Sequence, residues 1–383
     1  MKTNWDYRKI GDVCTVERGG SPRPIDDYIT DSPDGINWIK IGDTSDSMFI
    51  TQTAQKIIPE GMKKSRYVQP GDFLLSNSMS FGRPYILKID GCIHDGWLVL
   101  RDNDEVFDKR FLYYYLSAKP TYAKFKSMAV GGVVNNLNSE MVRKVEVPIP
   151  EKVEQAQIAD LLDIVNAVIL RRKQQLSALD DLIKARFVEM FGGCKTEVLI
   201  GDVVSICRGA SPRPIQAFIT DTADGVNWIK IGDVSENSLY ITQTAEKITQ
   251  DGAKKSRAVH KGDFILSNSM SFGRPYILGI DGCVHDGWLI LSDFRDTFDE
   301  LYLYNALRSE HIQHQFSSKV NGATVKNLNS DLVKSTYIQV PSMNEQRTFA
   351  DFCMQVDKSK VVVQKALDET QVLFDSLMQQ YFG

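Results

Sequence analysis

The chain has 383 residues, a length that suits two or three domains, and its 43% hydrophobic content is sufficient to bury proper cores. No apolar run reaches the roughly 18 residues needed to cross a bilayer, and the first residues lack the apolar core of a signal peptide, so we expect a cytoplasmic protein with no membrane contact. The net charge of −4 gives no global attraction to nucleic acid and leaves only local patches for that role.

The cysteines give no sign of a disulfide framework or a metal site. They form no Cys-x-x-Cys pair and no Cys/His spacing that would build a tetrahedral zinc site. We expect reduced, mostly buried thiols at Cys14, Cys92, Cys194, Cys207, Cys283 and Cys353.

The first 150 residues are rich in Gly, Pro, Asp and aromatic residues and contain short apolar runs. The run 73–75 follows Pro-Gly-Asp, and the run 97–100 follows Asp-Gly. Apolar runs bounded by turn residues predict short strands. Over 109–125, aromatic residues and Leu recur at spacings of three and four, which predicts a helix. We therefore expect a mixed α and β domain over 1–150.

A long amphipathic helix is predicted over 151–193. Its apolar residues recur at alternating spacings of four and three, and Gly192-Gly193 supply a C-terminal stop. About 35 helical residues span roughly 50 Å, a length that would serve as a ruler. The apolar positions are Ile158, Leu162, Val165, Ile169, Leu176, Leu179, Ile183 and Met190.

The second half of the chain repeats the first. Residues 19–25 return at 209–215, and an inserted residue near Asn237 then changes the offset from 190 to 191 residues. A period this long exceeds a solenoid unit, so each copy is a domain-sized block. We therefore expect a second domain over 194–341 and a second long helix over 342–383.

The second helix carries the same apolar register as the first, which predicts an antiparallel coiled coil. The alternative is that both are ordinary amphipathic core helices. The expected fold is α+β, with two tandem mixed α/β domains joined by two long helices in a pseudo-two-fold arrangement that would suit duplex DNA. The register positions are Phe349, Cys353, Val356, Val363, Leu367, Phe374, Leu377 and Tyr381.

The junction between domain and helix has the same pattern in both copies. A glycine turn and an Asn-Leu pair at 131–138 precede a proline-punctuated strand at 145–150 and a Glu-Gln pair that opens the helix. The counterparts are 322–329, Val340-Pro341 and 345–350. This duplicated pattern spans the chain and resembles the specificity subunits of type I restriction-modification systems.

The resemblance implies two target-recognition domains, each reading one part of a split site in double-stranded DNA. The long helices hold these domains apart and dock DNA methyltransferase (modification) subunits, two of them in our expectation, alongside restriction subunits. Catalysis then belongs to the partners, which bind S-adenosylmethionine for adenine methylation and ATP and Mg for restriction. The expected partner-binding residues are the Glu-Gln pairs Glu154, Gln155, Glu345 and Gln346.

Enzyme motifs are absent from the sequence. It contains no Asp/Asn-Pro-Pro-aromatic motif of amino-methyltransferases, no phosphate-binding loop of the Gly-x-x-x-x-Gly-Lys-Ser/Thr type and no Gly-x-Gly-x-x-Gly after a strand. A non-catalytic subunit without its own cofactor or metal is expected.

Three kinds of duplicated segment could contact DNA, which requires cationic and polar side chains. The Lys-Lys-Ser-Arg loops at 63–66 and 254–257 suit phosphates, or are solvated charged faces. The Ser-Asn-Ser-Met-Ser-Phe-Gly-Arg-Pro segments at 76–84 and 267–275 would approach a duplex closely, or form a simple turn. The third kind is an arginine between two prolines. The candidates are Arg23, Lys63, Lys64, Arg66, Asn77, Ser78, Ser80, Arg83, Arg213, Lys254, Lys255, Arg257, Asn268, Ser269, Ser271 and Arg274.

His94-Asp95 and His285-Asp286 allow several interpretations. A metal or general-base site would need further ligands or a nucleophile, and an Asp-Gly turn beside a buried Trp explains most of the pattern. We retain His94 and His285 as candidate DNA contacts.

The two domains are expected to read nearly the same half-site. Between 71–101 and 262–292, 26 of 31 positions are identical. A split site with inverted-repeat halves about one helical turn apart follows from pseudo-two-fold placement. Differences such as Lys88 against Gly279 would make one half-site slightly different from the other.

Three other functions remain open for the chain. It could be a specificity subunit of another methylation-based defence complex, a scaffold that mimics such a subunit without binding DNA, or a hydrolase that uses His94 and Asp95.

Overall fold

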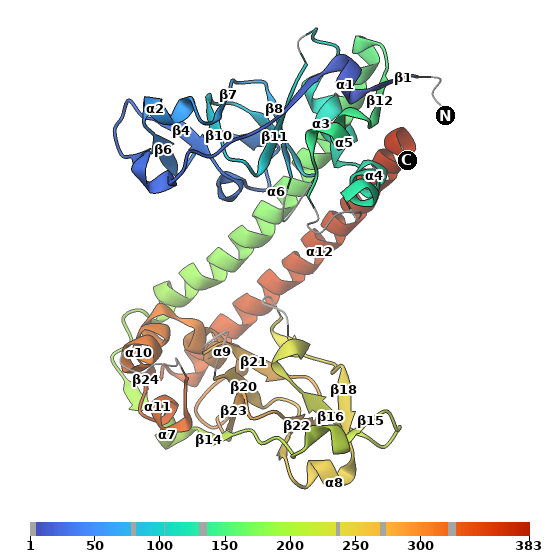
Figure 1. Cartoon of the computed structure of the whole chain (residues 1–383). Coiled ribbons are helices and arrows are strands. Elements are labelled where there is room, and N and C mark those ends of the chain that lie inside the picture. Colours follow the sequence, from blue (N-terminus) through green and yellow to red (C-terminus); the bar gives the residue numbers. More distant parts are fainter. Residues whose placement is uncertain are drawn as a thin grey trace. The chain divides into compact units, whose positions relative to one another are not determined.

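The computed structural model describes residues 5–77, 82–102, 104–129, 136–234, 238–268, 273–320 and 327–383 (Figure 1). The chain forms two compact units. The first comprises Met1–Lys173 and Lys365–Gly383, and the second comprises Gln174–Gln364. Each unit therefore contains one mixed domain and parts of both long helices.

The first unit contains two five-stranded sheets and a two-stranded one. Neighbouring strands within the large sheets are mostly distant in sequence, and two neighbours, β4–β10 and β5–β9, run parallel. The first sheet has the order β2 (Thr15–Arg18), β11 (Trp97–Arg101), β8 (Phe73–Ser76), β9 (Pro84–Leu87), β5 (Phe49–Ile50). The second has the order β3 (Ile29–Thr30), β6 (Gln55–Ile57), β4 (Ile36–Ile39), β10 (Gly91–Ile93), β7 (Arg66–Val68). The two-stranded sheet pairs β1 (Asp6–Lys9) with β12 (Glu146–Ile149).

The first of these sheets is the middle layer of the domain, and the alternation of side chains along its strands explains why. Phe73 and Leu75 of β8 pack with the helices, whereas Leu74 between them packs with residues of the second sheet. Successive side chains of a strand point to opposite faces, so a strand covered on both faces is apolar throughout. The order of layers is therefore helices, first sheet, second sheet (Figure 1).

The helices of the first domain differ from expectation in one respect. The single helix predicted over 109–125 is two helices, because the backbone of Ala118 is extended. Pro120 fixes its own φ and lacks an N–H, which is tolerated only in the first turn of a helix, so a new helix begins here. The helical elements are α1 (Ile10–Val13), η1 (Ile25–Asp27), η2 (Ile41–Asp43), α2 (Pro59–Met62), α3 (Lys109–Ser117), α4 (Lys119–Ala129) and α5 (Ser139–Arg143).

The second domain repeats this topology strand for strand. Its middle sheet has the order β14 (Ser205–Arg208), β23 (Trp288–Ser292), β20 (Phe264–Ser267), β21 (Pro275–Leu278), β17 (Tyr240–Ile241). Its outer sheet has the order β15 (Ile219–Thr220), β18 (Glu246–Ile248), β16 (Val226–Ile229), β22 (Gly282–Val284), β19 (Arg257–Val259). The remaining elements are β13 (Glu197–Leu199) paired with β24 (Tyr337–Gln339), and α7 (Ile200–Val203), η3 (Ile215–Ala217), η4 (Ile231–Asp233), α8 (Gln250–Ala253), α9 (Glu300–Arg308), α10 (Glu310–Val320) and α11 (Ser330–Lys334).

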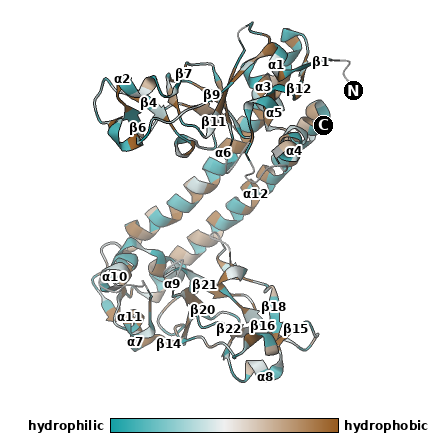
Figure 2. Cartoon of the chain, viewed as in Figure 1, coloured by the Kyte–Doolittle hydropathy of each residue, from teal (hydrophilic) through white to brown (hydrophobic). Residues whose placement is uncertain are grey.

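The two long helices pack against each other as the register predicted. Helix α6 spans Lys152–Phe191 and α12 spans Met343–Phe382, and each has 40 residues. In the first unit, Phe374 and Leu377 of α12 join the core that contains Ile158 and Leu162 of α6. In the second unit, Phe187 near the end of α6 packs on residues near the start of α12. The pairing is therefore antiparallel, and Figure 2 shows hydrophobic and hydrophilic stretches alternating along both helices.

A buried glutamine joins each domain to the start of the helix that follows it. Gln155 is fully buried, and its Nε2 donates to the carbonyls of Val106 and Pro150 at 3.1 and 2.9 Å, while its Oε1 accepts from Asp108 N at 2.7 Å. Asp108 in turn accepts from the N–H groups at the start of α3. One side chain thus ties together the loop before α3, the end of β12 and the first turns of α6.

The second domain has the same clamp. Gln346 is fully buried and donates to the carbonyls of Thr297 and Pro341 at 3.0 and 2.9 Å, and it accepts from Asp299 N at 2.8 Å. We call these two sets of contacts the glutamine clamps.

Replacing a clamp glutamine should destabilise the fold. Gln155→Ala leaves two carbonyls and one N–H without their partner in a buried place, so we expect a loss of about 2–4 kcal/mol in the free energy of unfolding. Urea denaturation of the full chain measures it. Gln157→Ala, at an exposed position of the same helix, is the control and should change stability by less than about 0.5 kcal/mol. Equal effects of the two substitutions would contradict the assignment.

Candidate nucleic-acid interface

In each domain, an arginine, a histidine and an asparagine among the candidates for DNA contact lie around one aspartate. In the first domain this is Asp95, in the turn between β10 and β11. Ser21 Oγ donates to Asp95 Oδ1 at 2.9 Å and accepts from Asp95 N at 3.2 Å. His94 Nε2 lies 3.0 Å from the same Oδ1, and Arg23 Nη2 lies 3.4 Å from Oδ2. We call Ser21, Arg23, His94 and Asp95 the first aspartate cluster.

The main chain of Asp95 is also fixed by hydrogen bonds from side chains. Its carbonyl accepts from Arg18 Nε at 3.2 Å and from Asn77 Nδ2 at 2.9 Å. The facing backbone comes so close that a Cβ added at Gly19 would lie 2.2 Å from the carbonyl oxygen of His94. Glycine is therefore required there for the segment after β2 to lie on the turn.

The environment stabilises the charged form of the carboxyl. Partial burial by itself raises the pKa of Asp95, but the hydrogen bond from Ser21 and the neighbouring His94, Arg18 and Arg23 outweigh it, so that the pKa lies below its ordinary value of 3.8. Asp95 is therefore a carboxylate at neutral pH.

The second domain contains the same cluster, built from Ser211, Arg213, His285 and Asp286. The Ser–Asp, Arg–Asp and His–Asp distances are 3.0, 3.2 and 3.0 Å. Burial again raises the pKa of Asp286. The hydrogen bond from Ser211 and the neighbouring His285, Arg213 and Arg208 lower it by more, so the pKa lies below its ordinary value. The arginines and histidines of both clusters were predicted as DNA contacts, and the aspartates were considered only beside those histidines, whereas the serines were not singled out.

A cavity of about 900 Å³ adjoins the second cluster. Arg213, His285 and Asp286 line it together with Trp228 from β16 and Lys230, whose Nζ lies 2.5 Å from Glu246 Oε1. Trp228 is buried, and the cavity is lined by apolar and charged side chains together.

Most of the other exposed candidates lie in the two Lys-Lys-Ser-Arg segments. Lys64 donates to the Tyr28 hydroxyl at 2.6 Å and lies over its ring, and Lys255 lies 4.6 Å from the centre of the Phe218 ring. Lys254 pairs with Asp251. The exposed members of this group are Lys63, Lys64, Arg66, Lys254, Lys255 and Arg257.

The two Lys-Lys-Ser-Arg segments are not equivalent in their surroundings. Arg66 lies 3.2 Å from Glu17, which also bonds Arg101. The residue of the second domain that corresponds to Glu17 is Cys207, which offers no carboxylate to Arg257. The ion pair between Arg66 and Glu17 therefore has no counterpart at Arg257 and Cys207.

Arg83 directly precedes β9, at the end of the strand that lies nearer to the first aspartate cluster. Its side chain is half-exposed. Its Nη2 lies 3.4 Å from the carbonyl of Ser45 and 3.6 Å from Asp46, and its guanidinium lies over the Tyr85 ring. Arg274 occupies the matching place and is partly buried. Both remain candidates for DNA contact.

The two asparagines among the candidates have structural roles instead. Asn77 and Asn268 are 2% and 5% exposed, and both amide groups donate to the carbonyl of the cluster aspartate. Burial and these bonds leave no accessible amide for a base. Ser78, Ser80, Ser269 and Ser271 lie outside the described residues.

The expected partner-binding residues are also engaged within the chain. Gln155 and Gln346 form the buried clamps, so they offer no surface to a partner. Glu345 Oε2 accepts from Ser342 N at 2.9 Å, which closes a capping box at the start of α12. Glu154 Oε1 accepts from Trp5 Nε1 at 3.1 Å. Their local roles explain why a Glu-Gln pair opens each helix.

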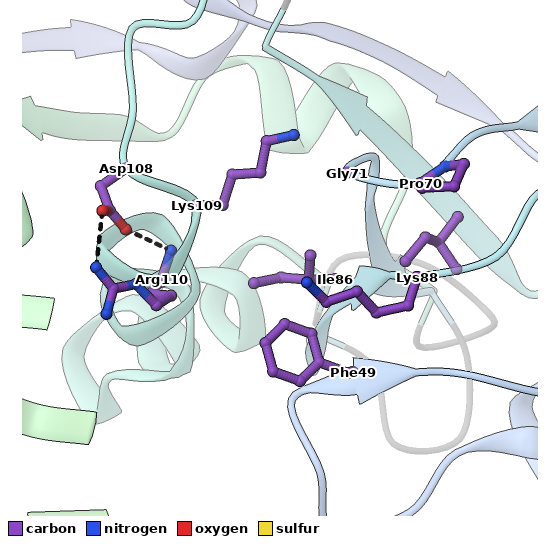
Figure 3. Close-up of a pocket in the computed structure, with 9 residues that line it drawn as sticks. Phe49, Pro70, Gly71, Ile86, Lys88, Asp108, Lys109 and Arg110 are labelled. Carbon is purple, nitrogen blue, oxygen red and sulfur yellow. Dashed lines mark hydrogen bonds and ion pairs between the residues drawn. The ribbon is translucent and has the colours of Figure 1, made fainter. Parts of the chain in front are cut away.

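One pocket distinguishes the two domains. It has a volume of about 450 Å³, and Figure 3 shows Phe49, Gly71, Lys88 and Lys109 around it, at the opposite end of β8 and β9 from the cluster. Lys88 Nζ lies 4.5 Å from the centre of the Phe49 ring. The corresponding residues of the second domain are Tyr240, Gly262, Gly279 and Glu300, so neither lysine is repeated.

Comparison with known proteins identifies the family. A sequence model described as the type I restriction modification DNA specificity domain matches residues 2–179 and again residues 195–369. The chain belongs to this family.

The specificity subunit is similar to several relatives over nearly its whole length. It is 19% identical to the type I restriction enzyme MjaVIII specificity subunit of Methanocaldococcus jannaschii, over 96% of this chain and 89% of that one. It is 20% identical to the EcoBI specificity subunit of Escherichia coli, over 91% and 80%. These relatives are named as specificity subunits, the non-catalytic components of restriction-modification complexes.

Solved structures share the fold. The subunit superposes with a TM-score of 0.62 on a chain from a structure that describes complex assembly and conformational transition of the type I R-M system, at 17% identity and with 99% and 97% of the two chains covered. The crystal structure of a type I S subunit from M. genitalium gives a TM-score of 0.54 at 15% identity, with 100% and 97% covered. The expected α+β fold with two tandem domains and paired long helices is thereby confirmed.

Two further expectations concern what the chain does not contain. Within the described ranges, no three His, Cys, Asp or Glu side chains gather as a metal site would require. No helix in the same ranges is long and apolar enough to cross a membrane. The six cysteines are free, and four of them are buried.

The aspartate clusters should make stability depend on acid pH. A carboxyl whose pKa is lower in the folded than in the unfolded chain stabilises the fold above its unfolded pKa, and this contribution is lost as the pH falls through the folded value. We expect the double variant Asp95→Asn, Asp286→Asn to be less stable than the wild type at pH 7 and the difference to shrink below about pH 4. Urea denaturation across pH measures it, with the exposed Asp34→Asn as control; a difference that is constant with pH would contradict it.

Proposed function

We propose that this specificity subunit binds a split DNA site whose two halves are nearly inverted repeats, and that it directs adenine methyltransferase and restriction subunits to that site. The observation that carries the proposal is the duplication of the aspartate cluster. The same four residue types recur with the same partners in both domains, and each distance within one cluster agrees with its counterpart to 0.2 Å or better.

The residues around the clusters support nearly equal half-sites. The cations at 63–66 return at 254–257, and 26 of the 31 residues at 71–101 return at 262–292. Two recognition domains with the same contact residues bind the same base sequence. If a pseudo-two-fold axis relates the two domains, the two half-sites in duplex DNA are inverted repeats of each other. Lys88 against Gly279 is a difference between the domains that lies away from the clusters.

Partner subunits supply the chemistry in this proposal. Two modification subunits bind S-adenosylmethionine and methylate adenine, and restriction subunits use ATP and Mg. The long helices offer a surface for them, because several large apolar side chains there are more than 60% exposed, and a protein partner would cover such residues. These side chains are Val153, Ile164, Val188, Val361, Val362 and Val372.

Methylome sequencing tests the half-site symmetry. The chain is expressed with its modification subunit in a host without other adenine methylation, and methylated adenines are mapped. We expect one bipartite motif whose halves are reverse complements at most positions, separated by unread base pairs. The control is the modification subunit expressed alone, which should give no motif. Two clearly unrelated halves would exclude the inverted-repeat site, and no motif would favour a scaffold that does not read DNA.

The exposed lysines are expected to contact phosphates. Lys63→Ala should weaken binding of the assembled complex to all sequences about equally and lower the slope of log affinity against log salt by about 0.9. Titration of labelled duplex at several salt concentrations measures both quantities. The matched control is Lys173→Ala at an exposed position of α6. An unchanged slope for Lys63→Ala would remove this loop from the interface.

A further inference from the structure

The arginine of each aspartate cluster combines high exposure with a fixed carboxylate beside it. The side chain of Arg23 is 80% exposed and that of Arg213 is 82% exposed, whereas Asp95 and Asp286 are 29% and 28% exposed. A guanidinium carries five N–H donors, and the ion pair with the aspartate uses only one edge of it. The high exposure of both side chains leaves the remaining donors accessible.

We propose that Arg23 and Arg213 each read a guanine in the major groove, one in each half-site, and that Asp95 and Asp286 are the residues that position them. The arginine donates to guanine O6 and N7, the most common specific contact between a side chain and a base. This assignment deepens the proposed function and rests on it.

The charge of the cluster favours a base over a phosphate. Asp95 is a carboxylate 3.4 Å from the Arg23 guanidinium, so the pair has no net charge. A phosphate approaching Arg23 would meet this carboxylate and be repelled by it. The neutral acceptors of guanine avoid this repulsion and still receive two hydrogen bonds from the planar guanidinium.

The contacts of the aspartate explain how the arginine is oriented. Oδ1 of Asp95 is occupied by Ser21 and His94, which leaves Oδ2 for Arg23. His94 Nδ1 accepts from Gly96 N at 2.9 Å, a bond that places the ring proton on Nε2, where it points at Asp95. These hydrogen bonds fix the orientation of the carboxylate. The guanidinium paired with it is already partly ordered, so it loses less side-chain entropy on binding DNA than an unpaired arginine would.

The pair also matches a whole G·C base pair. Arg23 offers two donors, and Asp95 Oδ2 lies next to them as an acceptor. In the major groove, a G·C pair presents two acceptors on guanine beside the amino donor of cytosine, and an A·T pair does not have this order. Because the second cluster has the same arrangement, the same base pair is expected at the matching position of each half-site.

Selection from a randomised duplex library tests the assignment. The full chain is assembled with its modification subunit, and bound duplexes are sequenced for the wild type, Arg23→Ala and Arg23→Lys. We expect a guanine in both halves for the wild type. Arg23→Ala should lose the preference at that position in one half only, by about 5- to 150-fold. Arg23→Lys should lose a smaller part of it, because lysine keeps the charge and loses the planar pair of donors.

Two matched variants separate positioning from general damage. Asp95→Asn should weaken the same base preference and raise affinity for non-cognate duplex, since it removes a negative charge. Arg8→Ala breaks a similar ion pair, Arg8 Nε to Asp6 Oδ2 at 3.0 Å, on β1 and should change no base preference. Melting temperatures of all variants confirm that they fold.

Other results would overturn the assignment. If Arg23→Ala weakened binding to all sequences equally and Arg23→Lys restored it, Arg23 would contact a phosphate. If Arg23→Ala changed neither affinity nor preference, the cluster would lie outside the interface. A wild-type complex that selects no split motif would contradict the proposed function itself, whereas a split motif without the two guanines would contradict this inference alone.

Discussion

The buried glutamine clamps are the constraint on which each recognition domain depends. A domain that reads DNA must present its polar turns in a fixed direction, and here one amide fixes the domain to its own helix through three backbone groups. The clamp partner Asp108 N belongs to the residue that caps α3, and α3 packs against the middle sheet that ends in the aspartate cluster. Rigid contacts thus run from the helix to the candidate interface.

The clamps also assign a structural role to the Glu-Gln pair. The resemblance to specificity subunits made it a candidate for partner binding, whereas its glutamine is buried and its glutamate is engaged locally. A residue pattern shared by a family is expected where a fold requires it as well as where a partner does. Exposed valines and isoleucine along the long helices are better candidates for that contact, because nothing inside the described chain covers them.

The architecture could be predicted from the periodicity and the duplication of the sequence. The contacts between residues that are distant in sequence could not. The register of α6 and α12 follows from spacing alone, as does the repetition of the domain. The parallel pairing of β4 with β10 is different, since more than 50 residues separate the strands. The assembly of the aspartate cluster was not predicted for the same reason: Ser21 and Asp95 are 74 residues apart, and no local pattern indicates that they touch. Asn77 resembled a surface residue because polar side chains are usually exposed.

The near-identity of the two clusters affects the orientation in which such a subunit binds DNA. On a site with matching halves, the subunit can bind in either of two opposite orientations with nearly equal free energy, which adds an entropic gain of about 0.4 kcal/mol from the twofold multiplicity. A duplex methylated on one strand would break that degeneracy, because the methyl group would lie beside one domain or the other. The two orientations are not identical for the subunit, because the lysines that line the pocket of the first domain, Lys88 and Lys109, have no counterpart in the second.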